Sequence, residues 1–513
     1  MQGSHQALSR VRGCAIHGSN NRAIAVHGCH FLPVERNIAY NIMGHAMFIE
    51  DGIEQHNILK ENVVMMVHQA WSLLNTDTTP ACFWISNSNN RFIRNRAIGS
   101  SHHGYWFDPP GGPTGPSSGR KIVITEFDKE IFYYDEYTKD SSGNPWSFPG
   151  QTTTKYCVDK KYCINLEEVV KTRSAPLLQF DNNTASSNGE HGVWIDKIDY
   201  KIFKKPNPKS REVYMRRNMY MNNVLAFNNR KEGIGVVMGV GHLQILDAIC
   251  MGNGVNIGYM KMSADGWATA ENNWQGHLIE RALIRGDPGR RTMGIGLPHG
   301  AWLTVKDTLF SRYIKDLPIH HCLICGGGKG GMEIRFLGTR FVESPKLPRL
   351  QFDGYWGSNI IYDMDGKLTN TSKPTWAHSA SGAATLFDGN SPLGHFPPEY
   401  CQFSKMVDGV ICDDRVSMRE VQFRMILPMA WIPIRLQTGP KQVSLPVPYY
   451  NYDSQGRRYN WHMTVVVVKT ADAVPIVHNM TFLMQPWEVD DPDSWIGEAR
   501  EMRPNEWTIL RMP

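Results

Sequence analysis

The sequence lacks several features that would point to common protein classes. It has no run of the about 18 apolar residues that a membrane-spanning helix needs. Residues 1–6 have no apolar stretch of the kind that a secretory signal carries. A P-loop, a dinucleotide fingerprint and a Gly-x-Ser-x-Gly pattern are also missing, so neither a nucleotide cofactor nor a serine-hydrolase mechanism is expected. Helical periodicity is almost absent, which argues against an α-helical fold.

Glycine and tryptophan, in contrast, are abundant. The 513 residues include 46 glycines and 15 tryptophans, a composition that suits a turn-rich β protein. Apolar residues make up 41% of the chain, enough for a sizeable core. The net charge of +5 permits a polyanionic partner without requiring one, and no nucleic-acid partner is expected.

A spaced set of polar and aromatic residues occurs three times in the first 200 residues. Each copy has an alanine anchor with an asparagine two residues before it, a histidine six after it, an aromatic residue nine after it and a carboxylate eleven after it. The copies are Asn37, Ala39, His45, Phe48, Glu50; Asn95, Ala97, His103, Trp106, Asp108; and Asn183, Ala185, His191, Trp194, Asp196. A repeat of this kind indicates copies of one structural unit, here one that carries ionisable groups.

Short strands separated by Asn, Gly and His predict an all-β parallel β-helix, in which asparagines at one corner stack as a ladder. We expect the β-helix in residues 1–107, an inserted loop region in 108–178, further β-helix in 179–372, a linker in 373–397 and a smaller β-rich domain in 398–513. The 58 residues between His45 and His103 predict one intervening coil and a separation of about 10 Å.

The first residues suggest a fragment, and the cysteines suggest an exported protein. Coils begin near residue 14 with no capping segment, so we expect a fragment of a longer protein. The pairs Cys157–Cys163 and Cys401–Cys412 are candidate disulfides.

The acidic residues of the repeat suit cleavage of a polysaccharide. A glycosidase needs two carboxyl groups about 5 to 10 Å apart, and Glu50 or Asp51 with Asp108 can supply them. A uronate lyase instead needs a base, for which His45 or His103 is the candidate. A purely structural interpretation is that each histidine and carboxylate form hydrogen bonds that finish a turn.

Two further kinds of site follow from the same region. His17, His45 and Asp51 offer nitrogen and oxygen ligands for a divalent metal, with calcium as the expected ion. Aromatic rings suit stacking against sugars, although tryptophan is also a core residue. The candidate substrate-binding residues are Trp84, Asn87, Asn90, Tyr105, Trp106 and Trp194. If the aromatic residues point inward, alternation along a straight strand places the histidines outside.

The strings His45–Gly52, Phe83–Asn90 and Pro113–Ser117, with Asp363-Met364-Asp365-Gly366 further on, carry a resemblance. They resemble the β-helix region of the cell-surface hyaluronidases, the cell migration-inducing hyaluronidase and the fibrocystin-like proteins. The resemblance implies a right-handed parallel β-helix outside the cell or at its surface, with membrane association only through segments missing from this chain. It further implies cleavage of hyaluronan or a related acidic glycan by acid/base chemistry. A non-catalytic, fibrocystin-like adhesion or receptor module is the alternative, and a uronate lyase is the third possibility.

Overall fold

A computed structural model describes residues 9–71, 77–118, 172–204, 214–237, 239–259, 276–298, 301–321, 333–352, 360–379 and 400–414, together with the short strands named below that lie outside these ranges. The chain forms two compact units, one of residues 1–323 with 336–350 and one of residues 324–335 with 351–513. No helix in the described part is long and apolar enough to cross a membrane.

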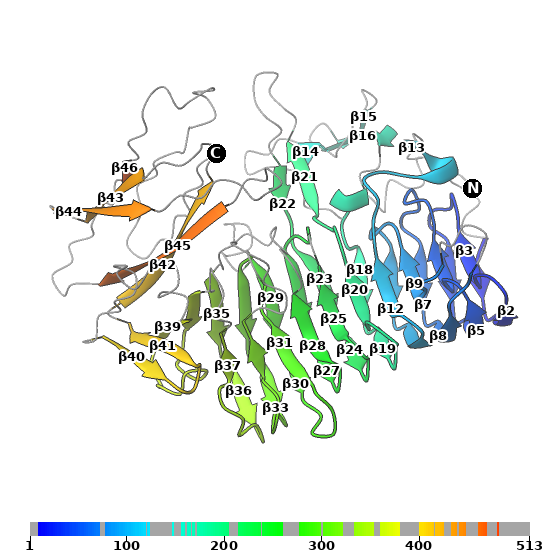
Figure 1. Ribbon diagram of the computed structural model, residues 1–513. Helices are drawn as coiled ribbons and strands as arrows, with labels where there is room; N and C mark the ends of the chain where they lie inside the picture. The colour runs from blue at the N-terminus through cyan, green and yellow to red at the C-terminus, as the bar shows by residue number, and fades with distance from the viewer. Residues whose placement is uncertain are drawn as a thin grey trace. The chain divides into compact units, whose positions relative to one another are not determined.

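The first unit is a parallel β-helix, as the sequence predicted (Figure 1). Each coil gives one strand to each of three parallel sheets. The first sheet contains β1 (Val11–Arg12), β4 (Pro33–Glu35), β7 (Ile58–Lys60), β10 (Arg91–Ile93), β18 (Gln179–Asp181), β23 (Met219–Asn222), β26 (Leu243–Leu246), β29 (His277–Glu280) and β32 (Leu303–Lys306). The second contains β2 (Ala15–Ser19), β5 (Ile38–Met43), β8 (Val63–His68), β11 (Arg96–Ser100), β19 (Thr184–Ser186), β24 (Leu225–Phe227), β27 (Ile249–Met251), β30 (Leu283–Arg285), β33 (Leu309–Ser311) and β36 (Arg340–Val342).

The third sheet carries the residues that matter for function. It contains β3 (Ile24–Val26), β6 (Met47–Ile49), β9 (Ala81–Ile85), β12 (His103–Phe107), β20 (Val193–Ile195), β25 (Glu232–Val236), β28 (Val255–Tyr259), β31 (Met293–Gly296) and β34 (Ile319–His320). The strands β35 (Glu333–Leu337) and β37 (Leu350–Gln351) each contain residues of both units. Since β9 pairs with both β6 and β12, the predicted intervening coil is confirmed.

An asparagine ladder holds the corner between the first and second sheets. The side-chain oxygen of Asn62 accepts hydrogen bonds from Asn37, that of Asn95 accepts from Asn62, and that of Asn183 accepts from Asn95. All four side chains are fully buried, so these bonds satisfy amides that water cannot reach. The residue before each asparagine has a positive φ, such as 54° at Arg36 and 53° at Arg94, because the chain must turn sharply there. The predicted ladder is confirmed.

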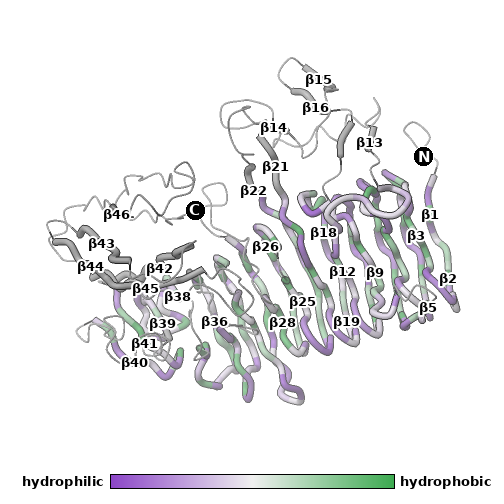
Figure 2. The backbone as a smooth tube through the Cα atoms, turned by 45° about the horizontal axis from the view of Figure 1, so that its top comes forward, coloured by the Kyte–Doolittle hydropathy of each residue, from purple (hydrophilic) through white to green (hydrophobic). Residues whose placement is uncertain are grey.

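Apolar side chains from all three sheets fill the inside of the coils. In the third sheet Phe83 stacks on Tyr105 with ring centroids 4.7 Å apart, and Phe107 and Phe180 pack beside them. All four are 0% exposed. Figure 2 shows hydrophobic and hydrophilic stretches alternating along the coils.

The segment 108–178 lies between two coils that pair directly with each other. Phe92 is in register with Phe180 and Trp106 with Trp194, although 88 residues separate each pair. The described parts of the segment include the 3₁₀ turns η2 (Gly115–Ser117) and η5 (Thr172–Ser174) and short antiparallel strands. Within the segment, β13 (Lys121–Val123) pairs with β17 (Glu167–Val169), and β15 (Lys155–Asp159) pairs with β16 (Tyr162–Asn165). The strand β14 (Trp146–Ser147) pairs with β21 (Lys201–Lys204) beyond the segment, and β21 also pairs with β22 (Tyr214–Arg216). Cys157 lies opposite Cys163, as a disulfide would require, but their side chains lie outside the described structure.

The second unit is antiparallel. It contains β38 (Ile360–Asp363), β39 (Thr375–Ser379), β40 (Cys401–Ser404), β41 (Gly409–Asp413), β42 (Val416–Arg424), β43 (Ile432–Thr438), β44 (Lys441–Val447), β45 (Asn460–Val468) and β46 (Met480–Thr481). Residues Thr375–Ser379 of the predicted linker 373–397 form the strand β39, which pairs with β38 and β41. A disulfide joins Cys401 and Cys412, which confirms one of the two predicted bonds.

Candidate functional site

Four aromatic side chains form one row across the third sheet. Strand pairing places Phe48 beside Trp84, Trp84 beside Trp106, and Trp106 beside Trp194. We call these four residues the aromatic row. The three tryptophans are partly exposed, whereas Phe48 is only 7% exposed. The neighbouring residues in sequence, such as Tyr105 and Phe107, fill the core, because successive side chains of a strand point to opposite faces. The row therefore lies on the outer face of the coils.

Glycines continue the row where the tryptophans end. Gly235 pairs with Trp194, and Gly258 and Gly296 follow in the next coils. A Cβ atom at Gly235 would lie 2.9 Å from the Trp194 ring, so the absence of a side chain leaves room for that ring. The aromatic row therefore ends in a strip of bare backbone.

Histidines line the edge of the row at which the strands begin. We call His45, His103 and His191 the histidine edge, and counting back along the paired strands places them in register. Each ring contacts the row: His45 lies 4.5 Å from Trp84, His103 lies 4.4 Å from Trp106, and His191 lies 3.9 Å from Trp194 (ring centroids). The prediction that histidines and aromatic residues occupy opposite faces is therefore wrong. His45 and His191 come two residues before their strands, where alternation does not apply.

Each histidine has polar neighbours on the inner side of this edge. Nδ1 of His45 accepts a hydrogen bond from the backbone N–H of Ala81, and its Nε2 lies 3.7 Å from Asp77. Nδ1 of His103 lies 3.0 Å from Nδ1 of His191. Burial, followed by the charge of His191, lowers the pKa of His103 well below its usual value. The neutral form of His103 is therefore favoured.

Carboxylates line the opposite edge. Glu50, Asp108 and Asp196 each follow the last residue of a strand, and we call them the carboxylate edge. Lys197 joins two of them, with Nζ 3.0 Å from Asp108 and 3.1 Å from Asp196. Burial raises the pKa of Asp196 despite its hydrogen bond to Lys197. Burial alone would lower the pKa of Lys197, but its two carboxylate partners raise it, so its positive charge is secure.

A second acidic group lies beside Phe48 at the same edge. Nδ1 of His27 lies 3.1 Å from Glu50 and 3.3 Å from Asp51. The guanidinium of Arg22 lies 3.6 Å from the centre of the Phe48 ring and donates a hydrogen bond of 3.2 Å to Glu50. Asp51 is only 3% exposed, and its Oδ2 atom accepts no hydrogen bond from the described residues. This group brings together a histidine, two carboxylates and a cation.

The predicted catalytic residues are thus divided between the two edges. His45 and His103 lie on the histidine edge, and Glu50 and Asp108 lie on the carboxylate edge, with Asp51 directly after Glu50. All five lie on the third sheet or at its corners. Their catalytic role stays a prediction.

Three predicted substrate-binding residues cannot reach a ligand. Tyr105, Asn87 and Asn90 are each 0% exposed. Tyr105 belongs to the core stack, and Asn90 accepts a hydrogen bond from Asn57 in a second asparagine pair. Asn87 donates its amide hydrogen to the carbonyl of Gly52, which fixes a corner. Trp84, Trp106 and Trp194 remain accessible.

The predicted metal ligands His17, His45 and Asp51 are not brought together. Within the described residues, two groups place potential ligand atoms within 4.8 Å of one another: His27 with Glu50 and Asp51, and His103 with Glu190 and His191. His17 lies on β2 in the second sheet, away from both groups. Each group contains imidazole nitrogen, whereas calcium prefers six to eight oxygen ligands. Calcium therefore fits neither donor set well.

Sequence reasoning missed Arg22, His27, Asp77 and Glu190. His27 directly follows β3, just as Glu50 follows β6, so the register of the coils was the signal that could have found it. Asp77 and Glu190 come from corners whose place depends on the fold, and no spacing in the sequence marks them.

Comparisons with known proteins agree with this fold. Residues 1–144 match the family model described as CEMIP beta-helix. Fibrocystin-L of Mus musculus is 30% identical over 453 residues, which cover 83% of this chain and 9% of that protein. The human cell surface hyaluronidase CEMIP2 is 29% identical over 235 residues, which cover 38% of this chain and 17% of that protein. The murine cell migration-inducing and hyaluronan-binding protein is 30% identical over 233 residues, with the same two coverages. The chain therefore spans less than a fifth of each relative, and the predicted resemblance is confirmed.

Proposed function

We propose that this chain, whose β-helix is homologous to those of fibrocystin-L and the cell-surface hyaluronidases, binds and cleaves an extended acidic polysaccharide such as hyaluronan. The observation that carries the proposal is the aromatic row between two edges of titratable side chains. We propose further that it acts outside the cell or at the cell surface, as the names of its relatives suggest for those proteins.

The geometry of the row supports binding of a linear glycan. Neighbouring coils stack about 4.8 Å apart, a distance comparable with the length of one sugar residue. A glycan chain that runs across the strands would therefore meet Trp84, Trp106 and Trp194 in turn. Aromatic faces make favourable contacts with the apolar faces of sugar rings. The glycine strip after Trp194 leaves room for the chain to continue.

Cations on the carboxylate edge support an acidic ligand. Arg22 lies against Phe48 at one end of the row, and Lys197 lies next to Asp108 and Asp196 further along it. Both are already paired with carboxylates, so a uronate group would compete with those pairs. This arrangement favours a ligand whose carboxylates recur at a regular spacing, because several such contacts act together.

Cleavage is assigned to the group around Glu50. A glycosidase needs one carboxyl group as general acid and another as base or nucleophile. One oxygen of Glu50, one oxygen of Asp51 and one nitrogen of His27 lie within 4.8 Å of one another. Nδ1 of His27 contacts both carboxylates, at 3.1 Å and 3.3 Å. We assign Glu50, which is 33% exposed, and Asp108, which is 31% exposed on the same edge, as the two carboxyl groups that contact the sugar, with Asp51 as the buried partner that positions Glu50 and His27.

A second candidate is a non-catalytic binding module. It is favoured by the alignment with fibrocystin-L, which covers 83% of this chain, whereas the alignment with the hyaluronidase covers 38%. In this case the aromatic row still binds the glycan, and the histidine and carboxylate edges only finish the turns of the coils. A uronate lyase is the third candidate, with His45 or His103 as base.

Hyaluronan of high molecular mass, incubated with the protein across an acidic-to-neutral pH series, separates these candidates. The chain length is measured by size-exclusion chromatography for the wild type and for Glu50→Gln and Asp51→Asn. Glu61→Gln is the control for Glu50→Gln, because Glu61 is a carboxylate of similar exposure, 27% against 33%, that pairs with arginines at another corner. We expect the wild type and Glu61→Gln to shorten the hyaluronan chains, and Glu50→Gln and Asp51→Asn to leave their length unchanged. Products that absorb in the ultraviolet would identify a lyase, and unchanged chain length would leave the binding module.

A further inference from the structure

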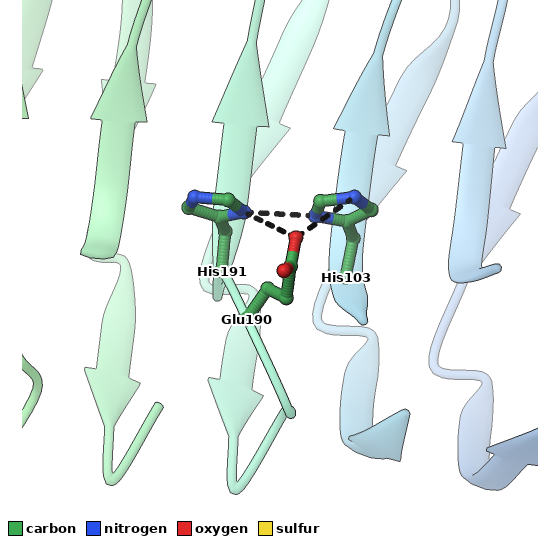
Figure 3. A group of neighbouring side chains, drawn as sticks. All are labelled: His103, Glu190 and His191. Atoms are coloured by element: carbon green, nitrogen blue, oxygen red, sulfur yellow. Dashed lines mark hydrogen bonds and ion pairs between the residues drawn. The ribbon is translucent and has the colours of Figure 1, made fainter. Parts of the chain in front are cut away.

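A cluster of two buried histidines, a buried glutamate and a partly exposed glutamate lies next to the tryptophan end of the aromatic row. His103 begins β12, and Glu190 and His191 come just before β20 in the next coil (Figure 3). His103 is 4% exposed, His191 is 3% exposed and Glu232, from the coil after that, is 6% exposed. In Figure 3 the two imidazole rings face each other and the Glu190 carboxylate reaches toward both. Residues from three consecutive coils thus meet at one point.

Both ring nitrogens of His191 have close polar neighbours. Its Nε2 lies 2.8 Å from Oε2 of Glu232, an ion-pair distance, and that oxygen accepts no hydrogen bond from the described residues. Its Nδ1 lies 3.0 Å from Nδ1 of His103. A carboxylate on the far nitrogen of a histidine is the usual partner of a metal-binding imidazole.

Glu190 lies beside both rings. Its Oε2 atom is 3.9 Å from Nε2 of His103. The other oxygen of Glu190 accepts a hydrogen bond of 2.7 Å from Lys231, so Oε2 is the oxygen left facing the two rings. It lies 3.8 Å from Nδ1 of His191. One carboxylate, 28% exposed, and two buried imidazoles therefore converge at this place.

We propose that His103, His191 and Glu190 bind a divalent transition metal of the zinc class, with Glu232 orienting His191. Two imidazole nitrogens and one carboxylate oxygen are a common ligand set for zinc. The ligand atoms of the three residues lie within 4.8 Å of one another, which leaves small side-chain movements to reach bonding distance. This site goes beyond the proposed function and does not depend on glycan cleavage.

The position of the cluster gives the metal a structural role. His103 and His191 are neighbours in space but 88 residues apart in sequence, on the two sides of the segment 108–178. A metal bound by both would join the coils before and after that segment. Because His103 and His191 also contact Trp106 and Trp194, the same metal would hold the tryptophan end of the aromatic row in place.

Metal titration of the purified full chain tests the proposal. Zinc or cobalt alone is added after treatment with a chelator, binding is followed by calorimetry, and the visible absorption of the cobalt form reports its ligand geometry. We expect one site, lost in His103→Gln and in His191→Gln but kept in His102→Gln, a change in the partly exposed neighbouring histidine. His27→Gln tests the other histidine group and is expected to leave this site unchanged.

Glu232→Gln keeps the test open if the histidine variants do not fold. It retains the size of the side chain and one hydrogen-bond acceptor, and we expect metal affinity to fall about 10- to 100-fold with an unchanged circular dichroism spectrum. Binding that survives both histidine substitutions, or that is lost only in His27→Gln, would overturn the assignment. The absence of measurable binding in the folded wild type would do the same and leave a shared proton between the rings.

Discussion

Removing one rung of the asparagine ladder should destabilise the β-helix strongly. Oδ1 of Asn95 accepts hydrogen bonds of 3.0 Å from both the backbone N–H and the side-chain amide of Asn62. Its own amide donates to the carbonyl of Leu59 at 2.8 Å and to Asn183 at 3.1 Å. Asn95→Ala removes all four bonds at a site that is 0% exposed.

The size of the effect follows from the groups that are left without partners. Each buried donor that loses its acceptor costs about 1–3 kcal/mol. Two donors of Asn62 lose theirs, so the free energy of unfolding should fall by about 2–6 kcal/mol. The acceptors of Leu59 and Asn183 also lose their donor, which adds to this, and relaxation of the neighbouring coils subtracts from it.

Urea unfolding, followed by the circular dichroism of the β-helix, measures this change. The control is Asn182→Gly, since Asn182 is an exposed corner residue with a φ of 56° that glycine adopts readily. We expect the control to lose less than about 1 kcal/mol. If Asn95→Ala loses no more than the control, the ladder does not hold the corner, and the reasoning is refuted.

Three further predictions concern other parts of the chain. Gly104→Ala should destabilise the fold by about 1–3 kcal/mol, because its Cβ would lie 2.4 Å from a backbone carbonyl of the next coil, whereas Gly111→Ala, with nothing within 4 Å, should change the melting temperature little. Burial lowers the pKa of His56 to about 3, so the stability that its neutral ring contributes is present above its unfolded pKa of about 6.5 and is lost as pH falls toward 3. At pH 5, His56→Asn should therefore remove about 2 kcal/mol of the acid destabilisation that urea unfolding measures for the wild type. Equal pH dependence of the two proteins would contradict this. Replacing Cys401 and Cys412 by serine should lower the stability of the second unit by about 2–3 kcal/mol in calorimetry, since the bond closes a loop with a sequence separation of 11, and an unchanged transition would show that the bond adds nothing.

The coil and its ladder were predictable because both depend on local spacing. An asparagine two residues before a buried alanine marks a corner in each copy of the repeat, and the 58 residues between His45 and His103 require one more coil. The aromatic row also follows from this register, since Trp106 and Trp194 occupy equal places in their copies.

The partners at the two edges were not predictable, because they depend on which corners meet in space. His45 approaches Asp77, which lies between β8 and β9 in the next coil, and His191 approaches Glu232 across one pair of strands. His45 and His191 precede their strands and His103 begins its strand, so alternation along a straight strand gives the wrong answer there.

The most direct test of the central claim is the affinity of the protein for a hyaluronan oligosaccharide, measured by calorimetry for the wild type and for Trp106→Ala. Trp71→Ala is the matched control, because Trp71 is 74% exposed and lies outside the aromatic row. Loss of one stacking contact of about 1–2 kcal/mol should weaken binding about 5- to 30-fold in Trp106→Ala and leave the control unchanged. Equal affinity of all three proteins would show that the glycan does not bind along the aromatic row, and the account of this surface would then be wrong.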